Sequence, residues 1–350
     1  MKRNTLIDVF RFVGAFLVVC IHIRFPKEFS DHFLMPVTRM AVPFFFMVSG
    51  YFLADINIDK MKQRLDKQIK HVFWLFAGAA AFYFCAEVIA AAIRNPGEVM
   101  DVVSRLWDWN RWYRFIAVND TWTLFGPLSQ HLWYLIALVY SMAAIRLALE
   151  HYPLKKLFWA IPVIGACIVP LTLIKWGVHR EWPAPLVRNF FTWGIPCVLA
   201  GAWMKCNTPR LQKLPRGLAA VLPIIFVLSS MAERYAFNRW TPIKSMNIYF
   251  NSLLLAASVI VLSLHFPGAG GRGPFARWGA RYSLMIYIIQ YFIIWLIEHA
   301  AAWLGIEHAP WYRWTAPVLV FAASLVFSMV WEWGKDQMKN RGAHAPEPKI

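Results

Sequence analysis

The chain has 350 residues, of which 59% are hydrophobic, 17% aromatic and only 16% charged. Soluble domains carry about 25% charged residues, so this composition excludes an ordinary soluble globule and indicates an integral membrane protein. The formal net charge of +17 does not indicate a nucleic-acid-binding protein. The basic residues fall in the connections between apolar runs instead of on one solvated face.

The apolar runs divide the chain into about ten helical spans, because one span needs about 20 apolar residues. We therefore predict an all-α polytopic membrane bundle. Lys and Arg gather in the connections that lie inside when both termini are cytoplasmic, which predicts that orientation. Residues 1–333 form one transmembrane domain, and residues 334–350 form a polar cytoplasmic tail. The predicted spans are Ile7–Ile23, Met40–Ala54, His71–Ile93, His131–Leu149, Leu157–Ile174, Asn189–Trp203, Leu218–Met231, Asn247–His265, Tyr282–Ala302 and Thr315–Trp333.

The first predicted span contains ionisable residues. Arg11 and His22 are eleven residues apart, and at about 100° per residue this spacing places them on nearly the same helix face. Such groups cost about 2.5–3.5 kcal/mol each on insertion scales, so they mark a pathway or a reacting site. Asp8 precedes Arg11 by three residues and can neutralise its guanidinium. The residues alone equally allow a snorkelling Arg11 and an interfacial His22.

The second span and the connection after it add further candidates. Ser49 and Gly50 form a small-residue pair that permits close helix approach. In the following connection, Arg64, Lys67 and Lys70 recur every three residues and can share a helical face that pairs with phosphate groups. An ordinary cytoplasmic loop is also basic, because insertion and anionic lipids favour it. The five cysteines show no metal-binding spacing, so we predict no metal site.

Four segments together resemble the membrane acyltransferase 3 family. They are Ile7-Asp8-Val9-Phe10-Arg11 through Cys20-Ile21-His22, Arg39-Met40-Ala41-Val42-Pro43-Phe44-Phe45-Phe46-Met47-Val48-Ser49-Gly50-Tyr51, His131-Leu132-Trp133-Tyr134, and Ser283-Leu284-Met285-Ile286-Tyr287. The resemblance implies a ten-span protein that uses cytoplasmic acyl-CoA to acylate a carbohydrate or lipid-linked glycan. The family's ninth-span pattern ends in a histidine, where this chain has Gln290.

The resemblance also implies roles for single residues. His22 acts as general base on the acceptor hydroxyl or briefly carries the acyl group; we favour the base, which needs no covalent intermediate. Arg11, oriented by Asp8, stabilises charge at the thioester or pantetheine carbonyl, or is only a structural partner of Asp8. The basic face binds the phosphates of CoA. The residues expected to line the pore or the substrate site are Arg39, Ser49, Trp133, Tyr287 and Gln290.

We therefore predict an O-acyltransferase of the bacterial cytoplasmic (inner) membrane. It moves an acyl group, most often acetyl in this family, from acyl-CoA to a hydroxyl of a surface polysaccharide or its lipid-linked precursor. Its partners are membrane lipids and the glycan acceptor, with no nucleic acid. The acyl chain, the acceptor hydroxyl and the oligomeric state are left open. Alternative predictions are a multi-span transporter or flippase, which buried Arg and His also suit, and a non-catalytic partner of a glycan-assembly complex.

Overall fold

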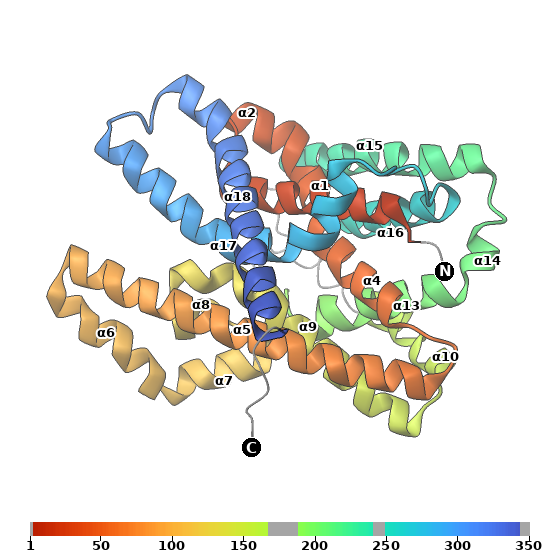
Figure 1. Cartoon of the computed structure of the whole chain (residues 1–350). Helices are drawn as coiled ribbons and strands as arrows, with labels where there is room; N and C mark the ends of the chain where they lie inside the picture. The colour runs from red at the N-terminus through yellow and green to blue at the C-terminus, as the bar shows by residue number, and fades with distance from the viewer. Residues whose placement is uncertain (1–2, 167–187, 241–248, 344–350) are drawn as a thin grey trace, which may run out of the picture.

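The computed structural model describes residues 3–166, 188–240 and 249–343. These residues are helical throughout, apart from turns and short connections, and they include no strand. The first helix, α1 (Thr5–His22), begins after Asn4, whose side chain accepts a hydrogen bond from the backbone N–H of Ile7. This N-cap satisfies one of the free donors at the helix start. Helix α1 lies near the centre of the molecule (Figure 1).

A broken second segment and one long helix follow α1. The second segment consists of α2 (Lys27–Phe29), the π-helical turn η1 (Ser30–Leu34), α3 (Met35–Thr38) and α4 (Ala41–Leu53). Helix α5 (Ile58–Arg94) has 37 residues and is therefore about 55 Å long, well above the ~30 Å of a hydrocarbon core. The first turns of this helix include the basic residues Arg64, Lys67 and Lys70, which precede the third predicted span. Its phosphate-binding candidates are therefore held on a rigid element.

Short helices connect α5 to α9 (Trp133–His151). They are η2 (Pro96–Glu98), α6 (Val99–Ser104), η3 (Arg105–Trp107), α7 (Trp109–Val118), α8 (Thr121–Phe125) and the 3₁₀ segment η4 (Pro127–Leu132). Glu87 of α5 is buried and accepts a hydrogen bond from the backbone N–H of Leu128 at 2.6 Å. This bond fixes η4, which carries His131, against α5.

The second half of the described chain contains longer helices. After α10 (Leu154–Leu157) and the undescribed residues 167–187 come η5 (Phe190–Gly194), α13 (Ile195–Cys206), α14 (Thr208–Leu211), α15 (Arg216–Trp240), α16 (Phe250–His265), α17 (Pro274–Trp303) and α18 (Pro310–Ala343). Helix α18 continues beyond Trp333, where the last span was predicted to end. The first residues of the predicted polar tail therefore belong to this helix.

Seven helical segments in the described ranges are long and apolar enough to cross a membrane. They overlap the predicted first, second, third, fourth, seventh, ninth and tenth spans, and the second begins earlier than predicted, at Lys27. Of the other three, the eighth corresponds to the shorter α16 and the sixth to η5 with α13. The fifth, 157–174, lies partly outside the described residues. The structure is thus consistent with a multi-pass membrane protein, and the ten-span count and the orientation remain predictions.

Glycines bring the helices around the site into direct backbone contact. A Cβ atom at Gly50 of α4 would lie 1.9 Å from the backbone oxygen of Val198 in α13, and one at Gly201 of α13 would lie 1.8 Å from that of Met47. Gly279 of α17 packs in the same way on the backbone oxygen of Asp8 in α1. Only glycine permits approaches this close. The close helix approach predicted at Ser49–Gly50 is confirmed at Gly50.

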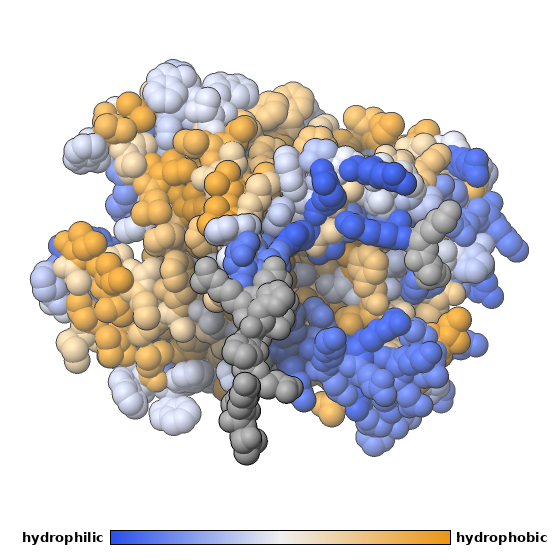
Figure 2. Space-filling model, in the orientation of Figure 1, coloured by the Kyte–Doolittle hydropathy of each residue, from blue (hydrophilic) through white to orange (hydrophobic). Residues whose placement is uncertain are grey.

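The surface separates apolar from charged regions. In Figure 2 the hydrophobic residues cover much of one side of the molecule, and the hydrophilic residues gather toward the side of α10 and α14. Exposed apolar side chains are numerous on the long helices, for example Trp74 on α5, Ile224 on α15 and Val326 on α18. Exposed apolar surface of this extent suits contact with lipid.

Candidate active site

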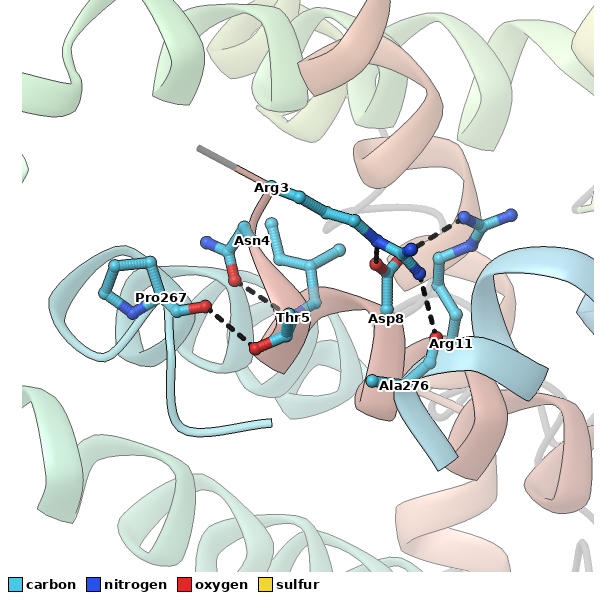
Figure 3. Close-up of polar contacts among 8 residues, drawn as sticks. Arg3, Asn4, Thr5, Asp8, Arg11, Pro267 and Ala276 are labelled. Atoms are coloured by element: carbon cyan, nitrogen blue, oxygen red, sulfur yellow. Dashed lines mark hydrogen bonds and ion pairs between the residues drawn. The ribbon is translucent and has the colours of Figure 1, made fainter. Parts of the chain in front are cut away.

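The start of α1 holds a buried carboxylate between two guanidinium groups (Figure 3). Asp8 is 4% exposed, and its Oδ2 lies 2.6 Å from Nε of Arg3. Its Oδ1 lies 3.4 Å from Nη1 of Arg11, which is the i,i+3 pair that the sequence predicts. Arg3 also donates to the backbone oxygen of Ala276 in α17 at 3.1 Å. Asp8 therefore fixes the Arg11 side chain relative to both α1 and α17.

Arg11 lines a cavity of about 440 Å³, which we call the basic cavity. Arg64 and Lys67 of α5 line the same cavity, so it contains three cationic side chains. Lys70 is exposed and does not contribute to this wall. The other lining residues include Val18, Val42, Ser49, Tyr134, Leu138, Ser283 and Tyr287. Two of the three predicted phosphate-binding residues thus share a cavity with Arg11.

Arg64 is held in place by a carboxylate outside the apolar segments. Its Nη2 lies 3.0 Å from Oδ2 of Asp55. The pKa of Asp55 lies below its ordinary value, because the backbone N–H of Asn57 donates to the carboxylate and Arg64 stabilises its charge. Asp55 is therefore ionised at neutral pH and available to orient the guanidinium.

A second, narrower cavity continues from the basic cavity. This central cavity has about 50 Å³ and is lined by His22, Arg39, His131, Trp133, Arg188 and Trp193, among others. It shares Val18, Val42, Tyr134 and Tyr287 with the basic cavity. Arg11 and His22 therefore line two adjoining cavities with common walls, as expected of residues on one helix face.

His22 lies in an aromatic cluster built by two other elements, α17 and η4. Its ring centroid is 5.0 Å from that of Tyr291 of α17 and 6.5 Å from that of His131 of η4. His131 stacks on Tyr291 with centroids 5.1 Å apart and lies 3.0 Å, through Nε2, from the backbone oxygen of Ile288. A carbonyl oxygen only accepts, so Nε2 of His131 carries the proton.

Further hydrogen bonds hold this cluster rigidly. The hydroxyl of Tyr287 donates to the backbone oxygen of His131, and the side-chain amide of Gln130 donates to the hydroxyl of Tyr291. Within the described part of the chain, the ring nitrogens of His22 have no hydrogen-bond partner. Nδ1 of His131 also has no partner there, so what distinguishes His22 is its position on the walls of two cavities, the central one and the one beyond the end of α1.

The central cavity is strongly cationic. Arg39 and Arg188 both line it, and the guanidinium carbon of Arg188 lies 5.9 Å from the ring centroid of Trp133. No carboxylate is found among the described residues of its wall. Burial lowers the pKa of Arg188, which still leaves a guanidinium charged at neutral pH.

A third cavity, the far cavity, adjoins the central one at His22. It has about 630 Å³ and is lined by mostly polar residues, including Arg24, Lys27, Asp31, Glu298, Glu307, His308, Tyr312 and Arg313. His22 is the residue that both cavity walls share. The three cavities thus follow one another from the basic face of α5, past Arg11 and His22, to the end of α1.

Most of the predicted site residues line the basic or the central cavity, and three do not. Arg11, Ser49, Arg64, Lys67 and Tyr287 line the basic cavity, and His22, Arg39, Trp133 and Tyr287 line the central cavity. Asp8 is buried behind Arg11. Lys70 and Gln290 lie away from all three cavity walls.

Gln290, predicted to line the pore, is fully buried between helices. Its Nε2 donates to the backbone oxygen of Tyr287 on the same helix at 3.2 Å. The aromatic side chain that reaches His22 is instead its neighbour Tyr291.

Sequence reasoning did not select four residues that the structure places at the site: His131, Tyr134, Arg188 and Tyr291. His131 and Tyr134 stand in the segment His131-Leu132-Trp133-Tyr134, which carried part of the family resemblance. Arg188 directly precedes a predicted span. Its position at the edge of an apolar run was the available signal for it.

A family model described as an acyltransferase domain matches residues 4–333. The chain belongs to the acyltransferase 3 family. The match covers nearly the whole chain, including every cavity residue described above. Residues 4–333 are thus an acyltransferase domain of this family.

Curated relatives are more distant and differ in name. The chain is 29% identical to a serine/alanine racemase from Enterococcus gallinarum over 54% of this chain and 25% of that protein. It is 23% and 27% identical to two amino-acid racemases from Enterococcus faecalis, over 87% and 73% of this chain and 43% and 40% of theirs. The chain therefore spans less than half the length of these relatives. No solved structure gives a significant match.

Proposed function

We propose that this protein transfers an acyl group, acetyl in the first instance, from cytoplasmic acyl-CoA to a hydroxyl of a surface polysaccharide or its lipid-linked precursor in the bacterial inner membrane. One observation carries the proposal: three cavities follow one another, and His22 is the residue that the described walls of the central and far cavities share. In this proposal the basic cavity opens to the cytoplasm, where CoA is found. The far cavity receives the acceptor.

The basic cavity suits the donor. CoA carries several phosphate charges, and Arg64 and Lys67 can pair with them at the mouth of the cavity. Its pantetheine arm then passes the apolar side chains between α1, α4 and α9 toward Arg11. The central cavity beyond, at about 50 Å³, is small enough to favour an acetyl group over long acyl chains.

The proposed reaction uses His22 as general base. Its free ring nitrogen takes the proton from the acceptor hydroxyl, and the hydroxyl oxygen attacks the thioester carbonyl carbon. When the tetrahedral intermediate collapses, the carbon–sulfur bond breaks and the imidazolium returns its proton to the CoA thiolate. The products are the O-acyl ester and free CoA. A positioned base typically contributes about 10²–10⁴-fold to such a step.

The test is transfer of label from [¹⁴C]acetyl-CoA in membranes that contain the protein and a surface-glycan acceptor pool. We expect labelled ester in the glycan fraction and its loss with His22→Ala. His32→Ala is the matched control, because His32 is exposed on η1 and contacts only the backbone oxygen of Glu28. Equal labelling by the wild type and folded His22→Ala would remove the base from the proposal.

The same experiment separates the alternatives. A transporter or flippase moves solute without consuming acetyl-CoA, and a non-catalytic partner yields no label while it co-purifies with a second protein. Racemase activity does not follow from the names of the relatives, because the chain covers less than half of each of those proteins.

A further inference from the structure

The charges around His22 are unbalanced in a way that the proposed transfer step does not explain. Arg39 and Arg188 line the central cavity together with His22, and Arg24 lines the far cavity together with it. Arg24 faces Asp31 at 3.9 Å, but Arg39 and Arg188 form no ion pair with any described residue. The Nε atom of Arg39 is buried and has no hydrogen-bond partner in the described part of the chain.

The other cations along the same path differ in this respect. Arg11 has Asp8 as its carboxylate partner, and Arg64 has Asp55. A buried charge without a partner costs several kcal/mol, so proteins rarely keep one unless a ligand supplies the missing charge. Two such guanidinium groups line the same small cavity as His22.

The two arginines also come from elements that hold them firmly. Arg39 lies between α3 and α4, whose backbone packs on α13 through Gly50 and Gly201. Arg188 precedes η5, and its guanidinium lies over the ring of Trp133. A guanidinium held over an aromatic face keeps its N–H donors directed sideways for a planar or tetrahedral anion.

We propose that the acceptor carries an anionic group, a phosphate or a carboxylate, close to the hydroxyl that is acylated, and that Arg39 and Arg188 bind this group. The proposal rests on the acyl transfer proposed above. The anion enters through the far cavity, whose wall carries both cations and carboxylates, and reaches the guanidinium groups in the central cavity, whose described wall carries no carboxylate. The neighbouring hydroxyl is thereby placed at His22.

A different use of the same arginines predicts a different result. If they stabilise only the negative charge of the tetrahedral intermediate, their loss lowers transfer to every acceptor equally. If they bind an anion on the acceptor, their loss lowers transfer to charged acceptors selectively. The ratio of kcat/KM values for matched charged and neutral acceptors therefore separates the two roles.

The experiment uses the full-length protein in lipid nanodiscs with [¹⁴C]acetyl-CoA and three acceptors: glucose, glucose 1-phosphate and glucuronate. We expect the wild type to prefer at least one charged sugar over glucose by about tenfold to hundredfold, the size of a charge-assisted bond. Preference for glucose 1-phosphate assigns a phosphate, and preference for glucuronate assigns a carboxylate. In Arg39→Gln and Arg188→Gln the ratio of kcat/KM for the charged sugar to that for glucose falls toward one. Arg94→Gln, which changes an exposed arginine at the end of α5, retains the wild-type ratio.

Ligand-induced thermal stabilisation without acetyl-CoA tests binding independently of the chemistry. The preferred charged sugar raises the melting temperature of the wild type more than glucose does, and this difference disappears in Arg39→Gln. Equal use of all three sugars by an active wild type overturns the anion site and leaves the acyl transfer standing. Stabilisation by a charged sugar with no acyl transfer to any acceptor supports the anion site and contradicts the proposed acyl transfer. A parallel fall for charged and neutral acceptors in both variants also overturns the proposal.

Discussion

Replacing Asp8 with asparagine tests the polar cluster that fixes the start of α1 (Figure 3). The substitution preserves shape but removes the charge that Arg3 and Arg11 share. A hydrogen bond to a charged group contributes about 1.5–3 kcal/mol, but that from Arg3, whose side chain is 55% exposed, is worth at most about 1 kcal/mol. The bond from Arg11 is longer, at 3.4 Å, but only a quarter of that side chain is exposed. We expect Asp8→Asn to lower the free energy of unfolding by about 2 kcal/mol.

The measurement is SDS-induced unfolding in mixed detergent micelles, followed by intrinsic tryptophan fluorescence. Asp31→Asn serves as the control, because Asp31 faces Arg24 at 3.9 Å and is more exposed, so its loss should cost less than about 1 kcal/mol. A double-mutant cycle of Asp8→Asn with Arg11→Gln should give a coupling energy above about 0.5 kcal/mol. A value for Asp8→Asn within about 0.5 kcal/mol of the wild type would show that the buried carboxylate does not hold Arg11 as argued.

Two further changes test the donor side and the helix packing. Lys67→Gln should raise the KM for acetyl-CoA several-fold but leave the KM for S-acetylpantetheine, which lacks the nucleotide phosphates, near the wild-type value. Lys70→Gln, outside the wall of the basic cavity, should change neither KM. An equal effect of the two substitutions would contradict binding of the CoA nucleotide at the basic cavity. Gly201→Leu should lower the unfolding free energy in the same SDS assay by more than about 2 kcal/mol, because a Cβ there would lie 1.8 Å from the backbone oxygen of Met47. Gly78→Leu, with open space around it, should be neutral. Equal stability of the two variants would refute the close contact of α4 and α13.

The sequence by itself determined the features that depend on composition and on spacing along one helix. Long apolar runs cannot fold as a soluble core of this length, so the helical membrane class followed from them, and the described residues form helices joined by turns and short connections, with no strand among them. The Asp8–Arg11 contact followed from i,i+3 geometry. The eleven-residue spacing of Arg11 and His22 predicted one face, and the two side chains line adjoining cavities.

The tertiary structure decided which residues of different helices meet. Lys70 continues the spacing of Arg64 and Lys67, yet it lies outside the cavity because the neighbouring helices enclose only part of that helical face. Gln290 stands where the family pattern has a histidine, but Tyr291 contacts His22. Arg188 and His131 come from distant segments, and no periodicity within one helix places them beside His22. Such contacts depend on how helices rotate and pack against each other, and that depends on small residues such as Gly50, Gly201 and Gly279 whose partners lie far away in the chain.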